Sequence, residues 1–308
     1  MEEKIYRQFC SLLGEDKVRR QEPMRKHTTF RIGGPADYFL RPDTIEALKK
    51  ILEFCRDEKI PWFILGNGSN LLVSDSGYRG AVIQLYRNFQ KTEVKGEEMQ
   101  AQSGALLSQM AAAAWKAGLT GMEFASGIPG TLGGAVVMNA GAYGGEMRDI
   151  LTEASLMDGE GNVFTLPAKD MELGYRTSAV KKRGWLVLGA KLKLQQGDPV
   201  AIRDRMEELK IKRCEKQPLE YPSAGSTFKR PEGYFAGKLI MDAGLRGFSV
   251  GGAQVSEKHC GFVVNRGEAT AEDVRTLISE VQNRVYARFG VKLEPEVRFL
   301  GDFERRSE

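Results

Sequence analysis

The chain has 308 residues, of which 42% are hydrophobic and 28% are charged, which is the profile of a soluble globular protein. This length exceeds what one ordinary hydrophobic core fills, so the sequence predicts two domains or three. The formal net charge is only +4 and no cluster of arginines and aromatic residues accompanies it, so nucleic acid is not an expected partner. The charge is compatible with a small anionic ligand.

The sequence shows no targeting signal and no metal-binding pattern. Its first residues, MEEKIYRQFC, are charged from the second position, unlike a secretory leader. No apolar run approaches the roughly 18–20 residues of a membrane helix, so we expect a cytoplasmic protein that does not enter a membrane. The cysteines Cys10, Cys55, Cys214 and Cys260 are too scattered to bind zinc or an iron–sulfur cluster, which predicts reduced thiols and no metal.

Helical and extended patterns follow one another in the first half of the chain. Residues 43–59 open on a capping residue and repeat apolar positions every three or four residues, which predicts an amphipathic helix. The stretch WFILGNGSNLLV reads as strand, loop and strand, and AVIQL as a further strand. LLSQMAAAAWKAG predicts a small-residue helix that Gly118 closes.

From residue 150 to 195 the pattern turns to strands. ASLMDGEGNVFTL predicts a hairpin over an Asp-Gly turn, and WLVLGAKLKL alternates with period two. The pattern changes near Gly197, where DPVAIRDRMEELKIKR predicts a charged helix at a domain boundary. Because strands and helices do not alternate strictly, we expect an α+β fold and not a parallel doubly wound sheet.

A long helix and a final strand are predicted near the C-terminus. Thr270 and Asp273 have the spacing of a capping box, and Gly290 ends the helix that follows. Its expected buried face consists of Val274, Leu277, Ile278, Val281 and Val285. The last strand is predicted over VKLEPEVRFL.

Two glycine-rich loops raise the question of a ligand. The first is LGNGSN at 65–70, and the second, GIPGTLGGAVVMNAGAYGGE at 127–146, contains seven glycines in twenty residues. A dinucleotide fingerprint is disfavoured because Leu71 stands where its third glycine should be. GYFAGK at 233–238 is one residue too short for a P-loop, and Leu239 replaces the magnesium-binding hydroxyl residue.

Glycine still exposes the backbone N–H groups and permits close approach of a ligand. Successive N–H groups in such turns form anion-binding nests, although each loop by itself is also explained as a tight turn. Hydrogen-bonding side chains are interleaved in both loops: Asn67, Ser69, Asn70, Thr131 and Asn139. The combination favours a phosphate-bearing cofactor.

Five motifs in this order resemble one enzyme family. They are ILGNGSNLLV, SGIPGTLGGAVVMNAGAYG, YRTS, AGSTFK and EPEVRFLG, within a similarity that runs from HTTFRIGGPADYFL to Gly301. The chain is similar to the UDP-N-acetylenolpyruvoylglucosamine reductases, also called UDP-N-acetylmuramate dehydrogenases. The resemblance implies an α+β protein with a two-subdomain FAD-binding fold of the vanillyl-alcohol-oxidase (PCMH) type and a C-terminal α+β substrate-binding domain.

The resemblance and the pattern change at Gly197 together predict the domain organisation. We expect an FAD-binding domain at 1–196, with subdomains of about 1–86 and 87–196. A substrate-binding domain should follow at 197–294, and residues 295–308 should return as a strand to the FAD-binding domain.

The family's activity implies the cofactors and the partner. Non-covalent FAD would take a hydride from NADPH and deliver it to UDP-N-acetylglucosamine enolpyruvate, giving UDP-N-acetylmuramate for peptidoglycan. The preference for NADPH over NADH comes from the resemblance alone. We expect a monomer.

Three residues match the family's catalytic motifs. Arg176 of GYRTS resembles the arginine that grips the enolpyruvyl carboxylate, and Glu296 of EPEVRFLG the glutamate paired with it over the enolate. Ser226 of AGSTFK resembles the serine that protonates C2. Taken alone, each of the three residues is also explained as a surface or turn residue. Because all three occur in the family's order, together with both glycine loops, a catalytic role is favoured. Lys229 is a hypothetical helper of the serine.

Binding residues are carried over in the same way. The expected FAD contacts are Gly66, Asn67, Gly68, Ser69, Asn70, Leu71, Ser126, Gly127, Ile128, Pro129, Gly130, Thr131, Gly133, Gly134, Asn139, Gly141, Ala142 and Tyr143. The expected substrate contacts are Lys216, Lys229, Arg230 and Gln254. His259 is as consistent with a core position as with a functional one.

Two departures from the family pattern concern the UDP moiety. Arg230 stands where relatives of one subgroup have asparagine, and no equivalent of their lid tyrosine lies between Lys181 and Gly197. The short connection VKKRGWLVLG indicates that the chain belongs with the subgroup that lacks this lid.

Two alternatives to the reductase stay open from the sequence. One is an oxidase or another flavin oxidoreductase on the same FAD-binding fold, which would share the glycine loops but not AGSTFK and EPEVRFLG in this arrangement. The other is a non-catalytic nucleotide-sensing or scaffold protein, which would not need Arg176, Ser226 and Glu296 together.

Overall fold

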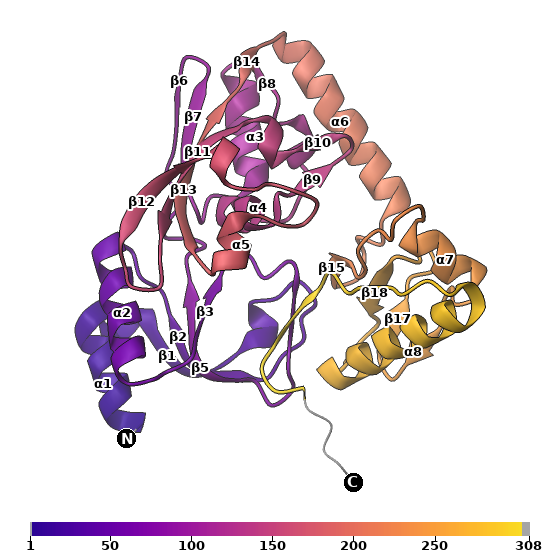
Figure 1. Ribbon diagram of the computed structural model, residues 1–308, viewed down its shortest axis with the longest axis horizontal. Helices are drawn as coiled ribbons and strands as arrows, with labels where there is room; N and C mark the ends of the chain where they lie inside the picture. Colours follow the sequence, from indigo (N-terminus) through magenta and orange to yellow (C-terminus); the bar gives the residue numbers. More distant parts are fainter. Residues whose placement is uncertain (1, 304–308) are drawn as a thin grey trace. The chain divides into compact units, whose positions relative to one another are not determined.

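The computed structural model describes residues 2–303, and Figure 1 shows their helices and strands. The chain forms two compact units, each built from three separate segments. The first unit contains Met1–Arg19, Phe39–Asn67 and Ala81–Arg213, and the second contains Arg20–Tyr38, Gly68–Gly80 and Cys214–Glu308. These units do not test the predicted division into FAD-binding and substrate-binding domains, which stays a prediction.

Helices are distributed along the whole described chain. Their bounds are α1 Glu2–Leu13, α2 Ile45–Asp57, α3 Leu107–Lys116, α4 Leu132–Met138, α5 Ala179–Arg183, α6 Pro199–Lys216, α7 Ala236–Asp242 and α8 Ala271–Phe289. Short 3-10 turns lie at Glu15–Lys17, Met24–Lys26, Glu123–Ala125, Met147–Asp149 and Ala168–Asp170.

Strands form small sheets that are mostly antiparallel. In the N-terminal part they are β1 Val18–Pro23, β2 Pro35–Leu40, β3 Trp62–Leu65, β4 Leu71–Val73, β5 Tyr78–Gln84, β6 Thr92–Lys95 and β7 Glu98–Gln102. The middle part contains β8 Leu119–Thr120, β9 Gly141–Ala142, β10 Gly145–Glu146, β11 Leu151–Met157, β12 Val163–Pro167, β13 Leu186–Lys193 and β14 Gln195–Gln196. The last strands are β15 Ser223–Ser226, β16 Ser249–Val250, β17 Ala253–Val255, β18 Phe262–Asn265 and β19 Arg298–Leu300. The sheet nearest the N-terminus has the order β1-β2-β5-β3.

The first unit is built around a five-stranded antiparallel sheet of order β12-β11-β13-β7-β6. The predicted hairpin is confirmed as β11 and β12, and its turn is closed by Asp158, whose Oδ1 accepts from the N–H groups of Glu160 and Asn162 at 2.9 Å. α3 and α4 lie beside this sheet (Figure 1) and share its buried core, to which they contribute Leu107, Met110, Leu132 and Val136.

The second unit combines the antiparallel sheet β15-β18-β17-β16 with α8, which packs against β17 and β16. The predicted buried face of α8 is confirmed, since all five apolar residues expected there are at most 2% exposed. The predicted capping box and the left-handed Gly290 that ends the helix are confirmed as well. In the same unit β19 pairs in parallel with β4, so that Arg298 lies opposite Leu71.

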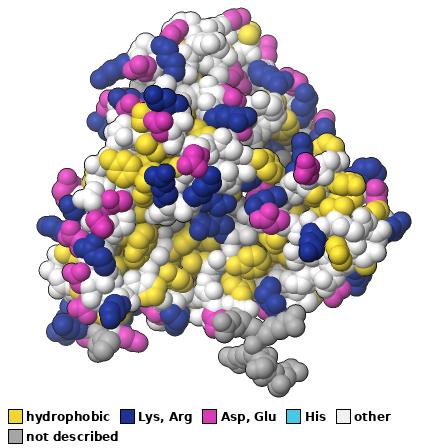
Figure 2. Space-filling model, viewed as in Figure 1, with side chains coloured by type: hydrophobic (Ala, Val, Ile, Leu, Met, Phe, Trp, Pro, Cys, Tyr) yellow, Lys and Arg dark blue, Asp and Glu magenta, His cyan; other side chains and the backbone are white. Residues whose placement is uncertain are grey.

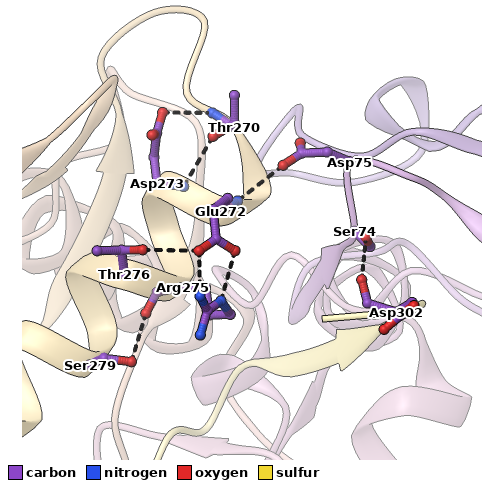
Figure 3. A network of polar contacts seen from close by, with 9 residues as sticks. All are labelled: Ser74, Asp75, Thr270, Glu272, Asp273, Arg275, Thr276, Ser279 and Asp302. Atoms are coloured by element: carbon purple, nitrogen blue, oxygen red, sulfur yellow. Dashed lines mark hydrogen bonds and ion pairs between the residues drawn. The ribbon is translucent and has the colours of Figure 1, made fainter. Parts of the chain in front are cut away.

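The first turn of α8 is held by acidic and hydroxyl side chains (Figure 3). Thr270 Oγ1 accepts from the N–H of Asp273, and Asp273 Oδ2 accepts from the N–H of Thr270, both at 3.0 Å. Asp75 is distant in sequence, and its carboxylate accepts from the N–H groups of Ala271 at 2.8 Å and Glu272 at 3.0 Å. The N–H groups that a helix start leaves without intrahelical partners are therefore satisfied.

Three sequence expectations are wrong in detail. The α2 helix is capped by Thr44, whose Oγ1 accepts from the N–H of Ala47, while Asp43 pairs with Lys17. The second glycine loop contains a helix, α4, because LGGAVVM packs Leu132, Ala135 and Val136 into the core. The final strand covers only Arg298–Leu300, since Pro295 interrupts the pattern with a residue that lacks an N–H.

No helix in the described part of the chain is long and apolar enough to cross a membrane. Basic and acidic side chains are interspersed over the face drawn in Figure 2, with apolar side chains between them.

Candidate functional site

In the first unit the structure brings the start of one glycine loop against the other. Asn67 Nδ2 donates to the carbonyl of Pro129 at 2.8 Å. A Cβ on Gly66 would lie only 2.5 Å from Thr131 Oγ1, so a larger residue here would force the Thr131 side chain to move. Sequence patterns located both loops, but the hydrogen bond between them depends on the fold.

The second loop presents backbone N–H groups without protein acceptors. Among the described residues, the N–H groups of Gly127, Gly130, Thr131 and Gly134 donate to no protein acceptor. By contrast, Leu132 donates to the Ala105 carbonyl at 2.9 Å. Unused donors in a glycine-rich turn at a helix start suit an anion such as a diphosphate. The residues present therefore fit the cofactor that the sequence implies.

Other predicted FAD contacts of this unit lie near these donors in sequence. Ser126 Oγ donates to the Glu123 carbonyl at 2.8 Å. Ile128 packs against the core, and Gly133 gives its N–H to the Ser103 carbonyl at 2.8 Å. Gly141 and Ala142 form β9, while Tyr143 follows with a left-handed backbone, φ 52°. Their part in binding FAD stays a prediction.

The rest of the first glycine loop lies in the second unit. Gly68 has φ 63°, and a Cβ there would be 2.0 Å from the His27 carbonyl oxygen, so any larger residue would displace this turn. The N–H groups of Gly68, Ser69 and Asn70 donate to no acceptor among the described residues. Leu71 is the first residue of β4. The turn thus offers further donors of the same kind.

Backbone hydrogen bonds of the second unit hold Glu296 next to the end of the strand that carries Ser226. Ser226 ends β15, pairs with Phe262 and is exposed, next to a bulge in which Gly225 has φ 76°. The N–H of Glu296 donates to the Thr227 carbonyl at 2.8 Å. Asn70 Nδ2 donates to the Glu296 carbonyl at 3.1 Å, and the Arg298 N–H donates to the Asn70 carbonyl, also at 3.1 Å. The backbones of two predicted catalytic residues are therefore fixed together.

Arg176 lies in the first unit, on a tight turn closed by Gly174 and Thr177. The N–H of each of these two residues donates to the carbonyl of the other, at 3.1 and 3.2 Å. Arg176 has a left-handed backbone, φ 56°, and its guanidinium lies 5.3 Å from the ring centroid of Tyr175. Its carbonyl accepts from Lys181 Nζ at 3.0 Å. The turn presents a half-buried arginine from a strained, well-held backbone.

The predicted substrate contacts have individual surroundings. Lys229 forms an ion pair with Glu294, which gives it a partner other than Ser226. The guanidinium of Arg230 lies 4.4 Å from the ring centroid of Phe235. Gln254 Nε2 donates to the Gly247 carbonyl at 3.1 Å, and Lys216 is exposed at the end of α6. Their contacts with substrate stay predictions.

His259 has a structural position. Its Nδ1 accepts from the Gly261 N–H at 3.1 Å, and its ring packs edge-on against Phe262 with centroids 5.0 Å apart. Burial lowers the pKa of this imidazole, so the neutral form is favoured in the folded protein. No group of His, Cys, Asp and Glu side chains suited to a metal is found among the described residues.

Several supporting side chains carried no signal in the sequence. Ser178 Oγ donates to the Val137 carbonyl at 2.8 Å, and Thr29 Oγ1 to the Ser223 carbonyl at 2.6 Å. His27 Nε2 lies 2.9 Å from Oε1 of the buried Glu22, below the turn at Gly68. The Ser178 and Thr29 contacts join residues 41 and 194 positions apart, so local patterns could not reveal them.

Comparisons with known proteins identify the families to which two parts of the chain are similar. Residues 36–167 match the FAD binding domain family, and residues 217–300 match the C-terminal domain of UDP-N-acetylenolpyruvoylglucosamine reductase. The fold and the FAD binding domain match thus define an FAD-dependent oxidoreductase, as the sequence predicted.

Relatives match nearly the whole chain. The UDP-N-acetylenolpyruvoylglucosamine reductase of Clostridioides difficile (strain 630) is 55% identical over 298 residues, covering 97% of this chain and 98% of the relative. That of Agathobacter rectalis is 55% identical over 296 residues, with 92% and 94% covered. The crystal structure of the Thermus caldophilus enzyme has a TM-score of 0.80 at 37% identity and covers 92% of this chain and 99% of its own. The chain belongs to the UDP-N-acetylenolpyruvoylglucosamine reductase family.

Proposed function

We propose that this enzyme reduces UDP-N-acetylglucosamine enolpyruvate to UDP-N-acetylmuramate with FAD and NADPH, in peptidoglycan precursor synthesis. Family membership over nearly the full length supports the reaction and favours a reductase over the oxidase alternative. The structural observation that carries the proposal is the hydrogen bond from the Glu296 N–H to the Thr227 carbonyl, which fixes Glu296 beside the strand end that exposes Ser226.

The glycine loops would hold the cofactor. The unused N–H groups of Gly127, Gly130, Thr131 and Gly134 in the first unit would donate to the diphosphate. The family resemblance implies further donors from the turn Asn67 to Asn70. When bound, FAD supplies the hydride relay between NADPH and the enolpyruvyl group. Neither His27 nor His259 lies in these loops, in keeping with non-covalent binding.

Three side chains would bind the substrate carboxylate, stabilise the enolate and donate the proton. Arg176 binds the enolpyruvyl carboxylate, because a planar guanidinium can grip it through two hydrogen bonds. Glu296 would be paired with Arg176 over the enolate, as the family resemblance implies. Ser226 gives its hydroxyl proton to C2, for which its exposed position at the end of β15 leaves the oxygen accessible.

Separate measurement of the two half-reactions tests this assignment. In Ser226→Ala, reduction of the flavin by NADPH should keep its wild-type rate, because that step needs no proton at C2. Reoxidation by the enolpyruvyl substrate should slow by roughly 10²–10⁴-fold or more, the usual worth of a general acid. Ser226→Cys should recover part of the loss, because a thiol is a stronger acid than an alcohol.

Ser249→Ala is the matched control, since Ser249 is an exposed serine in the same sheet whose hydroxyl donates only to the nearby Gly247 carbonyl. Both half-reactions of this variant should match those of the wild type. Equal slowing of the two half-reactions in Ser226→Ala, with no recovery by cysteine, would make Ser226 a turn residue and end its assignment as the proton donor.

We further infer that the enzyme works as a monomer in the cytoplasm, with neither nucleic acid nor membrane as a partner. The mixed surface charge and the small net charge support this view. Light scattering on the FAD-loaded protein should give a mass near 34.2 kDa. A stable mass of twice that value would contradict the monomer.

A further inference from the structure

One predicted cofactor residue is fully engaged with the protein. Asn139 follows α4 with a left-handed backbone, φ 41°, a conformation that asparagine tolerates better than most residues. Its side chain is buried, with 1% of the residue exposed. An amide at such a site must find its partners within the protein.

The partners fix which way the amide points. Oδ1 accepts from the backbone N–H of Arg148 at 2.9 Å. Nδ2 donates to Glu146 Oε2 at 2.9 Å and to the Gly174 carbonyl at 3.2 Å. An amide nitrogen has two hydrogens to donate, so none is left for a ligand. Glu146 is in turn held by Arg148, whose Nε lies 2.5 Å from its Oε1.

The Gly174 carbonyl is one end of the turn that carries Arg176. The other end is also fastened to α4, because Ser178 Oγ donates to the Val137 carbonyl at 2.8 Å. A left-handed arginine costs of order 1 kcal/mol or more and persists only where the surroundings hold it. The residues at the end of α4 therefore hold the strained turn from both sides.

We propose that Asn139 is a positioning residue for Arg176, and that α4 links cofactor binding to substrate binding. The start of α4 offers the unused N–H groups of Thr131 and Gly134, and its end supports the arginine turn. The helix then sets where the guanidinium stands with respect to a cofactor bound at its start. This role rests on the proposed function, because it assigns Arg176 to the enolpyruvyl carboxylate.

Asn139→Gly tests the role of the amide. Glycine keeps the left-handed backbone without strain and removes only the side chain. The variant should retain FAD and accept hydride from NADPH at the wild-type rate. The dissociation constant of the enolpyruvyl substrate, from its perturbation of the flavin spectrum, should rise about 10-fold. Reoxidation should slow about 10–100-fold, because a displacement near 1 Å costs that much.

Two further variants sharpen the test. Asn139→Asp should be worse than glycine, because its carboxylate would face both Glu146 Oε2 and the Gly174 carbonyl. Ser178→Ala, which releases the other end of the turn, should show the same selective loss of substrate binding. Asn162→Gly is the matched control, since Asn162 is an exposed asparagine bonded to Asp158 in the β11–β12 turn. It should leave both half-reactions unchanged.

A double-mutant cycle separates positioning from general support. If Asn139 acts through Arg176, Asn139→Gly should cause almost no further loss in an Arg176→Met background. Additive losses would overturn the proposal, as would loss of FAD from Asn139→Gly, which would make the amide a support of the whole glycine segment. A wild-type enzyme that the enolpyruvyl substrate fails to reoxidise would instead refute the proposed function.

Discussion

The carboxylate of Asp75 caps the start of α8 and should contribute to the free energy of unfolding (Figure 3). Asp75 accepts from the N–H groups of Ala271 and Glu272, while the side chains of Thr270 and Asp273 each accept from the backbone N–H of the other. Asp75→Ala removes both carboxylate oxygens that accept from Ala271 and Glu272, and leaves the capping box of Thr270 and Asp273 intact. The lost bonds are charge-assisted, and they also place a negative charge at a helix N-terminus, where it is favourable.

The magnitude depends on how well water replaces the carboxylate. Buried hydrogen bonds to a charged group are worth about 1.5–3 kcal/mol each, but Asp75 is exposed and water can reach the Glu272 N–H. The bond to Ala271, a residue only 1% exposed, is harder to replace. We expect Asp75→Ala to lower the free energy of unfolding by about 1–2 kcal/mol, similar to the loss of a helix cap. Asp75→Asn should cost about half as much, because it keeps one acceptor oxygen.

Urea unfolding of the full chain followed by circular dichroism measures this change, and hydrogen exchange locates it. The amides of Ala271 and Glu272 should exchange faster in Asp75→Ala. Asp57→Asn is the matched control, because Asp57 is an exposed aspartate in the last turn of α2 that forms a long ion pair with Arg56, at 3.8 Å. Unfolding of Asp75→Ala within about 0.5 kcal/mol of the control would refute the capping argument.

Two further predictions concern ionisable groups. Burial lowers the pKa of His259, so the unfolded chain binds a proton more readily than the folded one, and stability should fall as the pH drops below the ordinary histidine value of 6.5. His259→Gln should flatten the dependence of the unfolding free energy between pH 8 and pH 5, and an unchanged slope would contradict this role. Burial also raises the pKa of the Cys55 thiol from 9.0 to about 12, which reduces its thiolate fraction about 10³-fold. In the native protein a thiol reagent should therefore modify the exposed Cys214 and spare Cys55 until denaturant is added, whereas equal rates would show that Cys55 is accessible.

The sequence by itself determined the elements whose signals are local. α8 follows from a capping box, a repeating apolar face and a terminal glycine, all read within one helix. The β11–β12 hairpin follows from two apolar runs around Asp158 and Gly159. Each signal acts over a few residues, so neighbours along the chain are sufficient to produce it.

Family membership and the FAD-binding domain were also determined by the sequence. The ordered motifs from ILGNGSNLLV to EPEVRFLG identified the reductase family, which the relatives and the matching FAD binding domain confirmed. The residue assignments within the site stay predictions, because the comparisons identify the family and not the role of each side chain.

Local signals failed where packing or a distant partner decides the structure. The glycines at 127–146 suggested a loop, but three apolar side chains find a core to pack into, and that burial stabilises the short helix α4. Asp43 is as good a cap as Thr44, yet Lys17 engages it instead. The composition of neither segment reveals these partners.

Only the tertiary structure decided what the polar residues of the glycine loops do. Asn67 and Asn139 read alike in sequence, as hydrogen-bonding groups among glycines. In the folded chain the Asn67 amide donates to the Pro129 carbonyl. The Asn139 amide donates to Glu146 Oε2 and to the Gly174 carbonyl. The buried amide of Asn139 must be satisfied by the polar groups that the fold places around it, and its two acceptors lie 7 and 35 residues further along the chain.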